Sequence, residues 1–198
     1  MAIRRVVRLG HPVLRAVASE CSRVELESPE VQRLIDDMVE TMRDYGNGVG
    51  IAANQVGVSL RIFTMEVRAD NFKHSGPAEF PLEIHINPEV EVEGESSVMS
   101  PEGCLSVPGF RGVAARYPAL RLKSTDRFGN FVEQRLEGPP AIIVQHEIDH
   151  LNGHVYLDRL WSPAALGYEE ETARYSSLSK EYLEKLPGVH VQATTSQT

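Results

Sequence analysis

The sequence predicts an α+β fold in one domain, on three observations. Segments rich in apolar and β-branched residues, typical of strands, dominate the first two thirds of the chain, and helical patterns dominate the rest. This order differs from the regular strand–helix alternation of a βαβ architecture. The 198 residues, 41% of them hydrophobic, suit a single core. We expect one domain over residues 1–186 and a disordered tail over residues 187–198.

The clearest predicted helix spans residues 29–45. Its apolar residues recur at steps of three and four, so they form one face. These residues are Val31, Leu34, Ile35, Met38, Val39 and Met42. Ser28 is placed to cap the helix and Pro29 suits its first position, while Gly46 and Gly48 end it.

Four segments have the composition of strands. They are residues 60–67, 84–94, 119–125 and 131–137. The last two predict a β-hairpin, and Asn87-Pro88 is expected to divide the second segment into shorter extended pieces. Residues 68–81 predict a polar loop.

Two further helices are expected towards the C-terminus. One begins near Pro139-Pro140 and stops at Gly153. Because it is apolar on most sides, we expect it to be buried at the centre of the fold. The other spans roughly residues 164–185 and ends before Pro187-Gly188.

Charge and hydropathy exclude several classes of protein. The net charge of −8 and the lack of a block of basic residues argue against a nucleic-acid surface. No apolar run approaches the roughly 18 residues that a membrane span needs. The basic N-terminus lacks the continuous apolar stretch of a signal peptide, so we expect a cytoplasmic protein. In a reducing cytoplasm, Cys21 and Cys104 are expected to be structural, metal-binding or nucleophilic rather than disulfide-bonded.

Residues 146–150 read HEIDH and predict a metal site. On a helix, positions i and i+4 share a face, so His146 and His150 can present ring nitrogens to one point. Glu147 lies beside that point and can act as a proton acceptor. A divalent metal held in this way acidifies a bound water molecule. The alternative is a pair of histidines that find other partners in the core or in solvent.

A catalytic metal site needs three protein ligands and an open position. The residues leave three candidates for the third ligand: His154, a glutamate among residues 169–171 as in thermolysin-like peptidases, and Cys104. A metzincin-type site is excluded because Tyr156 stands where its third histidine would be. A Cys-His-His set suits ferrous iron as well as zinc, nickel or cobalt.

Residues 48–57 read GVGIAANQVG and predict a substrate-binding segment. Its glycines and alanines leave the backbone exposed, so that a substrate can approach closely. Gln55 supplies an uncharged amide that can stabilise an oxyanion. The alternative is a tight turn before a strand. A phosphate-binding loop is excluded because the pattern GxxxxGK[ST] is absent.

The stretches GVGIAANQ, EGCLS and QHEIDHLNG, in this order, closely resemble the three motifs of the peptide deformylase family. The match covers most of the chain, from Gly10 to Asp158. The resemblance implies antiparallel β-sheets that surround a central helix carrying HEIDH. It also implies metal-dependent hydrolysis that removes the N-formyl group from the N-terminal formylmethionine of newly made polypeptides and releases formate.

The resemblance also implies a role for each residue that matches the family's motifs. The implied metal ligands are Cys104, His146 and His150, which makes Cys104 the third ligand. The implied catalytic groups are Glu147 as general base and acid, with Gln55 and the backbone N–H of Leu105 as oxyanion donors. The implied substrate-binding residues are Val49, Gly50, Arg111, Ile142 and Ile143.

The family commonly uses ferrous iron, so we expect one Fe²⁺ per chain in the cell, and Zn²⁺, Ni²⁺ or Co²⁺ in purified protein. The expected partners are N-formylmethionyl nascent peptides in a bacterial cytoplasm, and an organellar origin is the alternative. In some bacterial members a basic C-terminal helix docks on the ribosome. Residues 162–186 are acidic on balance here, which argues against ribosome contact through that helix.

Two acidic residues near the motifs predict supporting contacts. We expect Glu102 to orient Gln55 or a ligand histidine, and Asp149 to pair with Arg116, since a buried aspartate needs a partner. A solvated Asp149 is the alternative.

Two rival functions are a zinc endopeptidase that uses a glutamate among residues 169–171, and a non-catalytic relative that keeps the fold. The presence of every matched site residue argues against the second.

Overall fold

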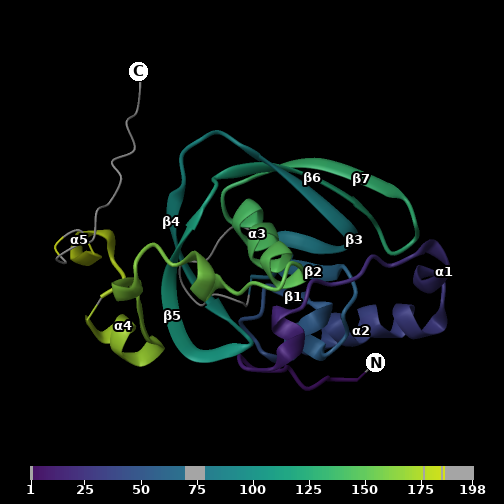
Figure 1. The fold of residues 1–198 in the computed structure, drawn as a ribbon, viewed down its shortest axis with the longest axis horizontal. Coiled ribbons are helices and arrows are strands. Elements are labelled where there is room, and N and C mark those ends of the chain that lie inside the picture. Colours follow the sequence, from purple (N-terminus) through teal and green to yellow (C-terminus); the bar gives the residue numbers. More distant parts are fainter. Residues whose placement is uncertain (1, 70–78, 176, 184, 186–198) are drawn as a thin grey trace.

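Two antiparallel sheets and a central helix form the framework of the protein (Figure 1). The computed structural model describes residues 2–69, 79–175, 177–183 and 185. The larger sheet, in the order β1-β2-β3-β6-β7, consists of Gly50–Ala52, Ile62–Val67, Phe80–Glu93, Ala119–Thr125 and Phe131–Glu137. The smaller sheet, in the order β4-β5-β8, consists of Val98–Cys104, Val107–Arg116 and Leu166–Tyr168. Strands pair antiparallel throughout both sheets, so the predicted α+β class is confirmed.

Five α-helices and four short 3₁₀ helices complete the described part of the chain. The α-helices α1 to α5 are Arg23–Leu26, Pro29–Asp44, Pro139–Leu151, Glu169–Tyr175 and Lys180–Leu183. The 3₁₀ helices are Pro12–Arg15, Ala53–Val56, Tyr156–Arg159 and Pro163–Ala165. None of the helices in this described part is long and apolar enough to cross a membrane.

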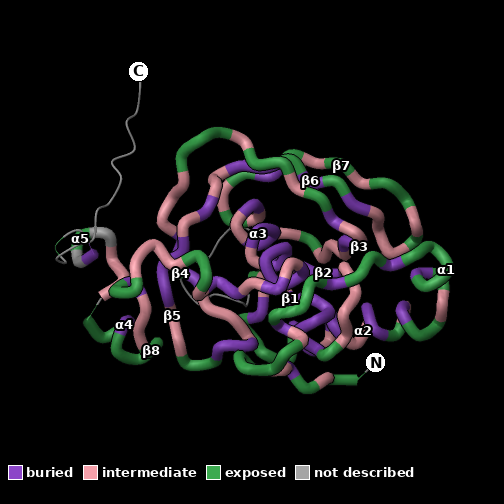
Figure 2. The backbone as a smooth tube through the Cα atoms, viewed as in Figure 1, coloured by how far each residue is buried: buried purple, intermediate pink, exposed green. Residues whose placement is uncertain are grey.

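The five-stranded sheet has a helix on each face. Alternate residues of a strand point to opposite faces. In β2, Ile62 packs in the hydrophobic cluster that contains the apolar face of α2, whereas Phe63 and Met65 pack in the cluster that contains α3. Figure 2 shows the consequence: α2 keeps an exposed side, while α3 is buried over most of its surface. The predicted central position of α3 is therefore confirmed.

Local signals set the ends of both long helices where the sequence predicts them. The Ser28 hydroxyl accepts a hydrogen bond from the Val31 backbone N–H, which caps α2. Helix α3 begins with two prolines and ends before Gly153, which adopts a φ of +76°. A Cβ atom on Gly153 would lie 2.8 Å from the Arg15 carbonyl oxygen, so only glycine lets the N-terminal segment pass this closely.

Residues 84–93 belong to one strand, β3, rather than to the shorter extended segments that the sequence predicts over 84–94. Strand β3 runs through Asn87, where the pairing with β6 shifts register and φ is +49°. The Asn87 side chain explains why the chain tolerates this bulge: it accepts from the Cys21 backbone N–H at 2.8 Å and donates to the Cys21 carbonyl at 2.9 Å. The strand begins at Phe80, so the predicted loop over 68–81 ends earlier, and residues 70–78 of that loop lie outside the described residues.

The single helix predicted over residues 164–185 is wrong. Residues 166–168 instead form β8, which pairs with β5 in the register Phe110↔Tyr168 and Gly112↔Leu166. The short helices α4 and α5 follow. The edge of β5 that faces away from β4 offers this segment backbone hydrogen bonds, and these override its helical propensity. The tail predicted over 187–198 lies outside the described residues.

Candidate active site

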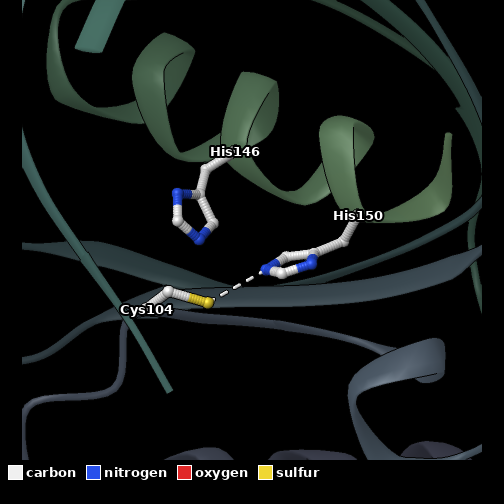
Figure 3. Close-up of side chains that lie close together, drawn as sticks. All are labelled: Cys104, His146 and His150. Atoms are coloured by element: carbon white, nitrogen blue, oxygen red, sulfur yellow. Dashed lines mark hydrogen bonds between the residues drawn. The ribbon is translucent and has the colours of Figure 1, made fainter. Parts of the chain in front are cut away.

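Three potential metal ligands converge between β4 and α3. Cys104 lies at the end of β4, and His146 and His150 lie one turn apart on α3 (Figure 3). Their ligand atoms all lie within 4.8 Å of one another. The Cys104 Sγ atom is 3.2 Å from Nε2 of His150. This spacing is close enough for one ion to contact all three atoms, given metal–sulfur and metal–nitrogen bonds of roughly 2.0–2.3 Å.

A chain of buried charges orients His146. Its Nδ1 atom lies 2.7 Å from Glu102 Oε2, which leaves Nε2 free for a metal. Arg116 donates two hydrogen bonds to Glu102, at 2.7 and 3.0 Å, and one to Asp149 at 2.6 Å. The expected pairing of Asp149 with Arg116 is confirmed. Arg159, whose contact the sequence did not predict, donates to the same aspartate at 2.9 Å and extends this series of ion pairs to the surface.

The electrostatics of this cluster favour a thiolate. Burial alone would raise the pKa of Cys104, but the charge of His150 and hydrogen bonds with His146 and His150 lower it to about 5. Burial likewise opposes ionisation of Glu102, yet its hydrogen bonds to His146 and Arg116 lower its pKa to about 2. A thiolate, two imidazoles and a carboxylate behind one of them form a donor set that fits a divalent metal.

Glu147 is a buried acid that lacks a full set of partners. Its side chain is 3% exposed, and among the described residues its Oε2 atom has no hydrogen-bond partner. Burial raises the pKa of Glu147 to about 7, which is suited to a group that takes and returns a proton near neutral pH. Buried polar atoms are normally satisfied, so this carboxylate is placed to interact with a group that enters the cavity.

Gln55 is held with its amide nitrogen towards Cys104. The Ala52 backbone N–H donates to Gln55 Oε1 at 2.9 Å, which fixes the orientation of the amide. The Gln55 Nε2 atom then lies 3.5 Å from Cys104 Sγ and 3.2 Å from Ser106 Oγ. Glu102 thus orients a histidine rather than Gln55. Leu105 follows Cys104 along the wall of the same cavity.

A cavity of about 510 Å³ opens beside these groups. The predicted substrate-binding residues Val49, Gly50, Arg111, Ile142 and Ile143 all line it. Ile143 also belongs to the hydrophobic core that packs α3 against the large sheet, so only part of its side chain faces the cavity. The structure therefore brings together the residues for which the sequence predicts metal-binding, catalytic and substrate-binding roles.

The other candidate ligands are not part of the metal cluster. The ligand-atom cluster found among the described residues contains neither His154 nor any of Glu169, Glu170 and Glu171. Glu169 accepts a hydrogen bond from Arg111 at 3.1 Å instead. Cys104 is therefore the residue whose position completes the set.

Tyr156 packs against the metal cluster in a contact that the sequence did not predict. Its ring stacks on His146 with centroids 6.2 Å apart and an interplanar angle of 18°. The side chain is fully buried, and its hydroxyl is without a hydrogen-bond partner among the described residues. No local pattern signals this contact, because it depends on how the 3₁₀ helix after α3 turns back towards the metal cluster.

Gly50 approaches Glu147 so closely that a substitution there tests the position of the carboxylate. A Cβ atom at this position would lie 2.4 Å from Glu147 Oε1 and 2.9 Å from its Cδ. We expect Gly50→Ala to displace the carboxylate. The kcat of the formyl-peptide hydrolysis that the family resemblance implies should then fall about a hundredfold, since a shift near 1 Å has an effect of that order. Metal content and the midpoint of thermal unfolding should change little. Wild-type kcat in this variant would show that the carboxylate position is not critical.

Comparisons with known proteins agree on one family. The family model described as polypeptide deformylase matches residues 3–165. A peptide deformylase of Leptospira biflexa is 40% identical over 173 residues, which cover 86% of this chain and 95% of the relative. The Met-Ala-Ser-bound crystal structure of the class I type b peptide deformylase from Acinetobacter baumannii has a TM-score of 0.74 at 36% identity, over 80% of this chain and 100% of that one. The Thermotoga maritima peptide deformylase structure has a TM-score of 0.71 at 36% identity, over 82% and 100%.

Proposed function

Because the chain belongs to the polypeptide deformylase family, we propose that Cys104, His146 and His150 hold its metal and that Glu147 handles the protons of its reaction. As a member of this family it is a metal-dependent hydrolase, which removes the N-formyl group from N-formylmethionyl peptides and releases formate. The observation that carries the assignment of residues is the convergence of three ligand atoms next to a buried, under-partnered carboxylate.

The donor set supports a particular group of ions. We propose Fe²⁺ as the ion in the cell, with Zn²⁺, Ni²⁺ or Co²⁺ replacing it in purified protein, because one thiolate and two imidazoles suit these borderline metals. When bound, such an ion lowers the pKa of a water molecule and polarises a carbonyl oxygen. The Glu102 carboxylate, 2.7 Å from the far nitrogen of His146, holds that ring in the tautomer that leaves Nε2 as a ligand.

The residues around the cluster divide the remaining tasks. Glu147 takes the proton of the attacking water and delivers it to the departing amine. The Gln55 amide and the Leu105 backbone N–H donate hydrogen bonds to the oxygen that becomes negative. Each donor of this kind contributes roughly 2.7–4 kcal/mol to transition-state stabilisation. Gln55 Nε2 and the Ser106 backbone N–H both lie within 3.5 Å of the Cys104 sulfur, so Gln55 is held next to the segment that carries Leu105.

Substrate binding is assigned to the walls of the cavity. The backbone of Val49 and Gly50, at the start of the edge strand β1, is placed to pair with an extended peptide. Ile142 and Ile143 on α3 supply an apolar surface for the methionine side chain. The Acinetobacter relative binds Met-Ala-Ser, a peptide that begins with methionine, and we propose that this chain takes formylated peptides of the same kind.

The setting of the reaction is also a proposal. We place the protein in a bacterial cytoplasm, as one catalytic domain over residues 1–186, which agrees with the predominance of bacterial relatives. Its nascent-chain substrates bring it near the ribosome. Helix α4 begins with three glutamates, so any contact with ribosomal RNA would use another surface.

The decisive experiment is formate release from a formyl-Met tripeptide by protein purified without oxygen. We expect release by the wild type, and loss of both metal and activity in Cys104→Ala, since two histidines alone leave the site one ligand short. Metal per chain is measured alongside by plasma mass spectrometry. The triple variant Glu169→Gln, Glu170→Gln, Glu171→Gln is the control, and it should keep its metal. Metal retained without Cys104 but lost in the triple variant would favour the endopeptidase alternative.

A further inference from the structure

Two opposite charges face each other at the open end of the cavity. Arg111 on β5 and Glu169 at the start of α4 both line it, and Arg111 Nε donates to Glu169 Oε1 at 3.1 Å. We propose that Glu169 is a specificity-determining residue, which together with Arg111 selects peptides by the charge of the residues downstream of formylmethionine. The inference rests on the proposed function and adds a residue that comes from the C-terminal segment.

The fold holds Glu169 at this place. Strand β8 pairs with β5 from Gly112↔Leu166 to Phe110↔Tyr168, so the residue that follows it is fixed beside Arg111. The rings of Phe110 and Tyr168 are in contact, with centroids 4.4 Å apart. The segment that the sequence predicts as one helix therefore contributes Glu169 to the lining of the cavity.

Arg111 is positioned from its other side as well. A Cβ atom on Gly103 would lie 2.9 Å from Arg111 Nη1, so the guanidinium rests against the backbone next to Cys104. Among the described residues that line the cavity, the other charged side chains belong to the metal cluster and its support. Glu102 is occupied by Arg116 and His146, and Glu147 is buried beside the ligands. The rim thus carries one positive and one negative charge.

The two charges lie at the exposed end of the cavity, whereas the metal cluster lies at its buried end. The groups that act on the formyl end are almost fully buried, with His150 at 0% and Glu147 at 3% exposure. The side chains of Arg111 and Glu169 are 36% and 51% exposed. An extended peptide whose first residue reaches the ligands can therefore place its following side chains beside these two charges. An acidic side chain there is attracted by Arg111 and repelled by Glu169, and a basic one experiences the reverse.

The test compares Glu169→Gln with wild type on formyl-Met-Ala-X and formyl-Met-X-Ala, where X is Asp, Asn or Lys. We expect the ratio of kcat/KM for Asp over Lys peptides to rise about fivefold in at least one series, the scale of one exposed charge pair. Arg111→Gln should lower the same ratio. Because the effect is electrostatic, about 0.5 M salt should reduce it strongly, whereas a loss of packing would affect all peptides equally.

Glu171→Gln is the matched control, because it removes the same charge from α4 at a residue that does not line the cavity. An unchanged ratio in Glu169→Gln, or an equal shift in Glu171→Gln, would overturn the inference. Calorimetric binding of the product peptides Met-Ala-Asp and Met-Ala-Lys to the metal-loaded protein measures the same preference without turnover. If no formyl peptide were hydrolysed, the proposed function would fail, and these affinities would still decide the role of Glu169.

Discussion

Replacing Glu147 by glutamine is expected to lower formate release by a factor of about 10²–10⁴ while the metal stays bound, the range typical of a lost general acid–base. The substitution keeps the size of the side chain but removes its ability to take a proton. Glu147 is outside the cluster of ligand atoms, so the ligand set is intact. We would measure kcat/KM on a formyl-Met tripeptide together with metal per chain.

The fold should tolerate this change. A glutamine avoids the cost of burying a charge in a side chain that is only 3% exposed, so the free energy of unfolding should stay equal or rise slightly. Glu40→Gln is a matched control, because it changes another acid with a buried oxygen that lacks a partner in the described structure, on α2 and away from the cavity. Near-normal turnover in metal-loaded Glu147→Gln would remove Glu147 from the mechanism.

Local sequence signals were enough to predict the framework of the site. The serine cap and the three- and four-residue apolar spacing of α2 act within a few residues, and so do the prolines and glycine that bound α3. The i, i+4 spacing of His146 and His150 follows from helix geometry alone. These elements were therefore predictable without knowledge of the tertiary fold.

Contacts between distant segments were predictable only in two cases: where a family motif identified the residue, or where a buried charge needed a partner of opposite sign. The third ligand, Cys104, lies 3.2 Å from a histidine that is 46 residues away, and the residues alone left His154 and a glutamate as alternatives. Asp149 was expected to find Arg116 because a buried acid needs a partner. No local sequence pattern predicts that Arg159 donates a hydrogen bond to the same aspartate, since that contact depends on the turn after α3.

The C-terminal segment shows the opposite case, in which tertiary structure overrides a local pattern. Residues 166–168 carry no strong strand signal, but the edge of β5 lies beside them and supplies partners for their backbone groups. At Asn87, a bulge stabilised by side-chain hydrogen bonds to Cys21 lets the strand continue where the sequence predicts a break. Both errors arose from interactions with chain segments far away in sequence.

Replacing Arg116 by methionine is expected to destabilise the protein by about 3–5 kcal/mol, because it leaves buried carboxylates without their main counter-charge. Arg116 is 3% exposed and makes three hydrogen bonds of 2.6–3.0 Å, two to Glu102 and one to Asp149. Among its partners in the described residues, Glu102 would keep only His146, whereas Asp149 would keep Arg159. We would measure the free energy of unfolding in urea at saturating metal.

Arg159→Met provides the comparison, because it removes an arginine from the same aspartate at a side chain that is 44% exposed. Its effect should stay below about 1 kcal/mol, as for other exposed ion pairs. If burial of unpaired charge is the cause, Asp149→Asn should recover part of the stability that Arg116→Met loses. The changes in unfolding free energy of Arg116→Met and Asp149→Asn should then not add in the double variant. Additive effects, or equal losses in the two arginine variants, would mean that Arg116 acts through packing of its side chain. The stability of the site then would not depend on the charge chain that connects His146 to the surface.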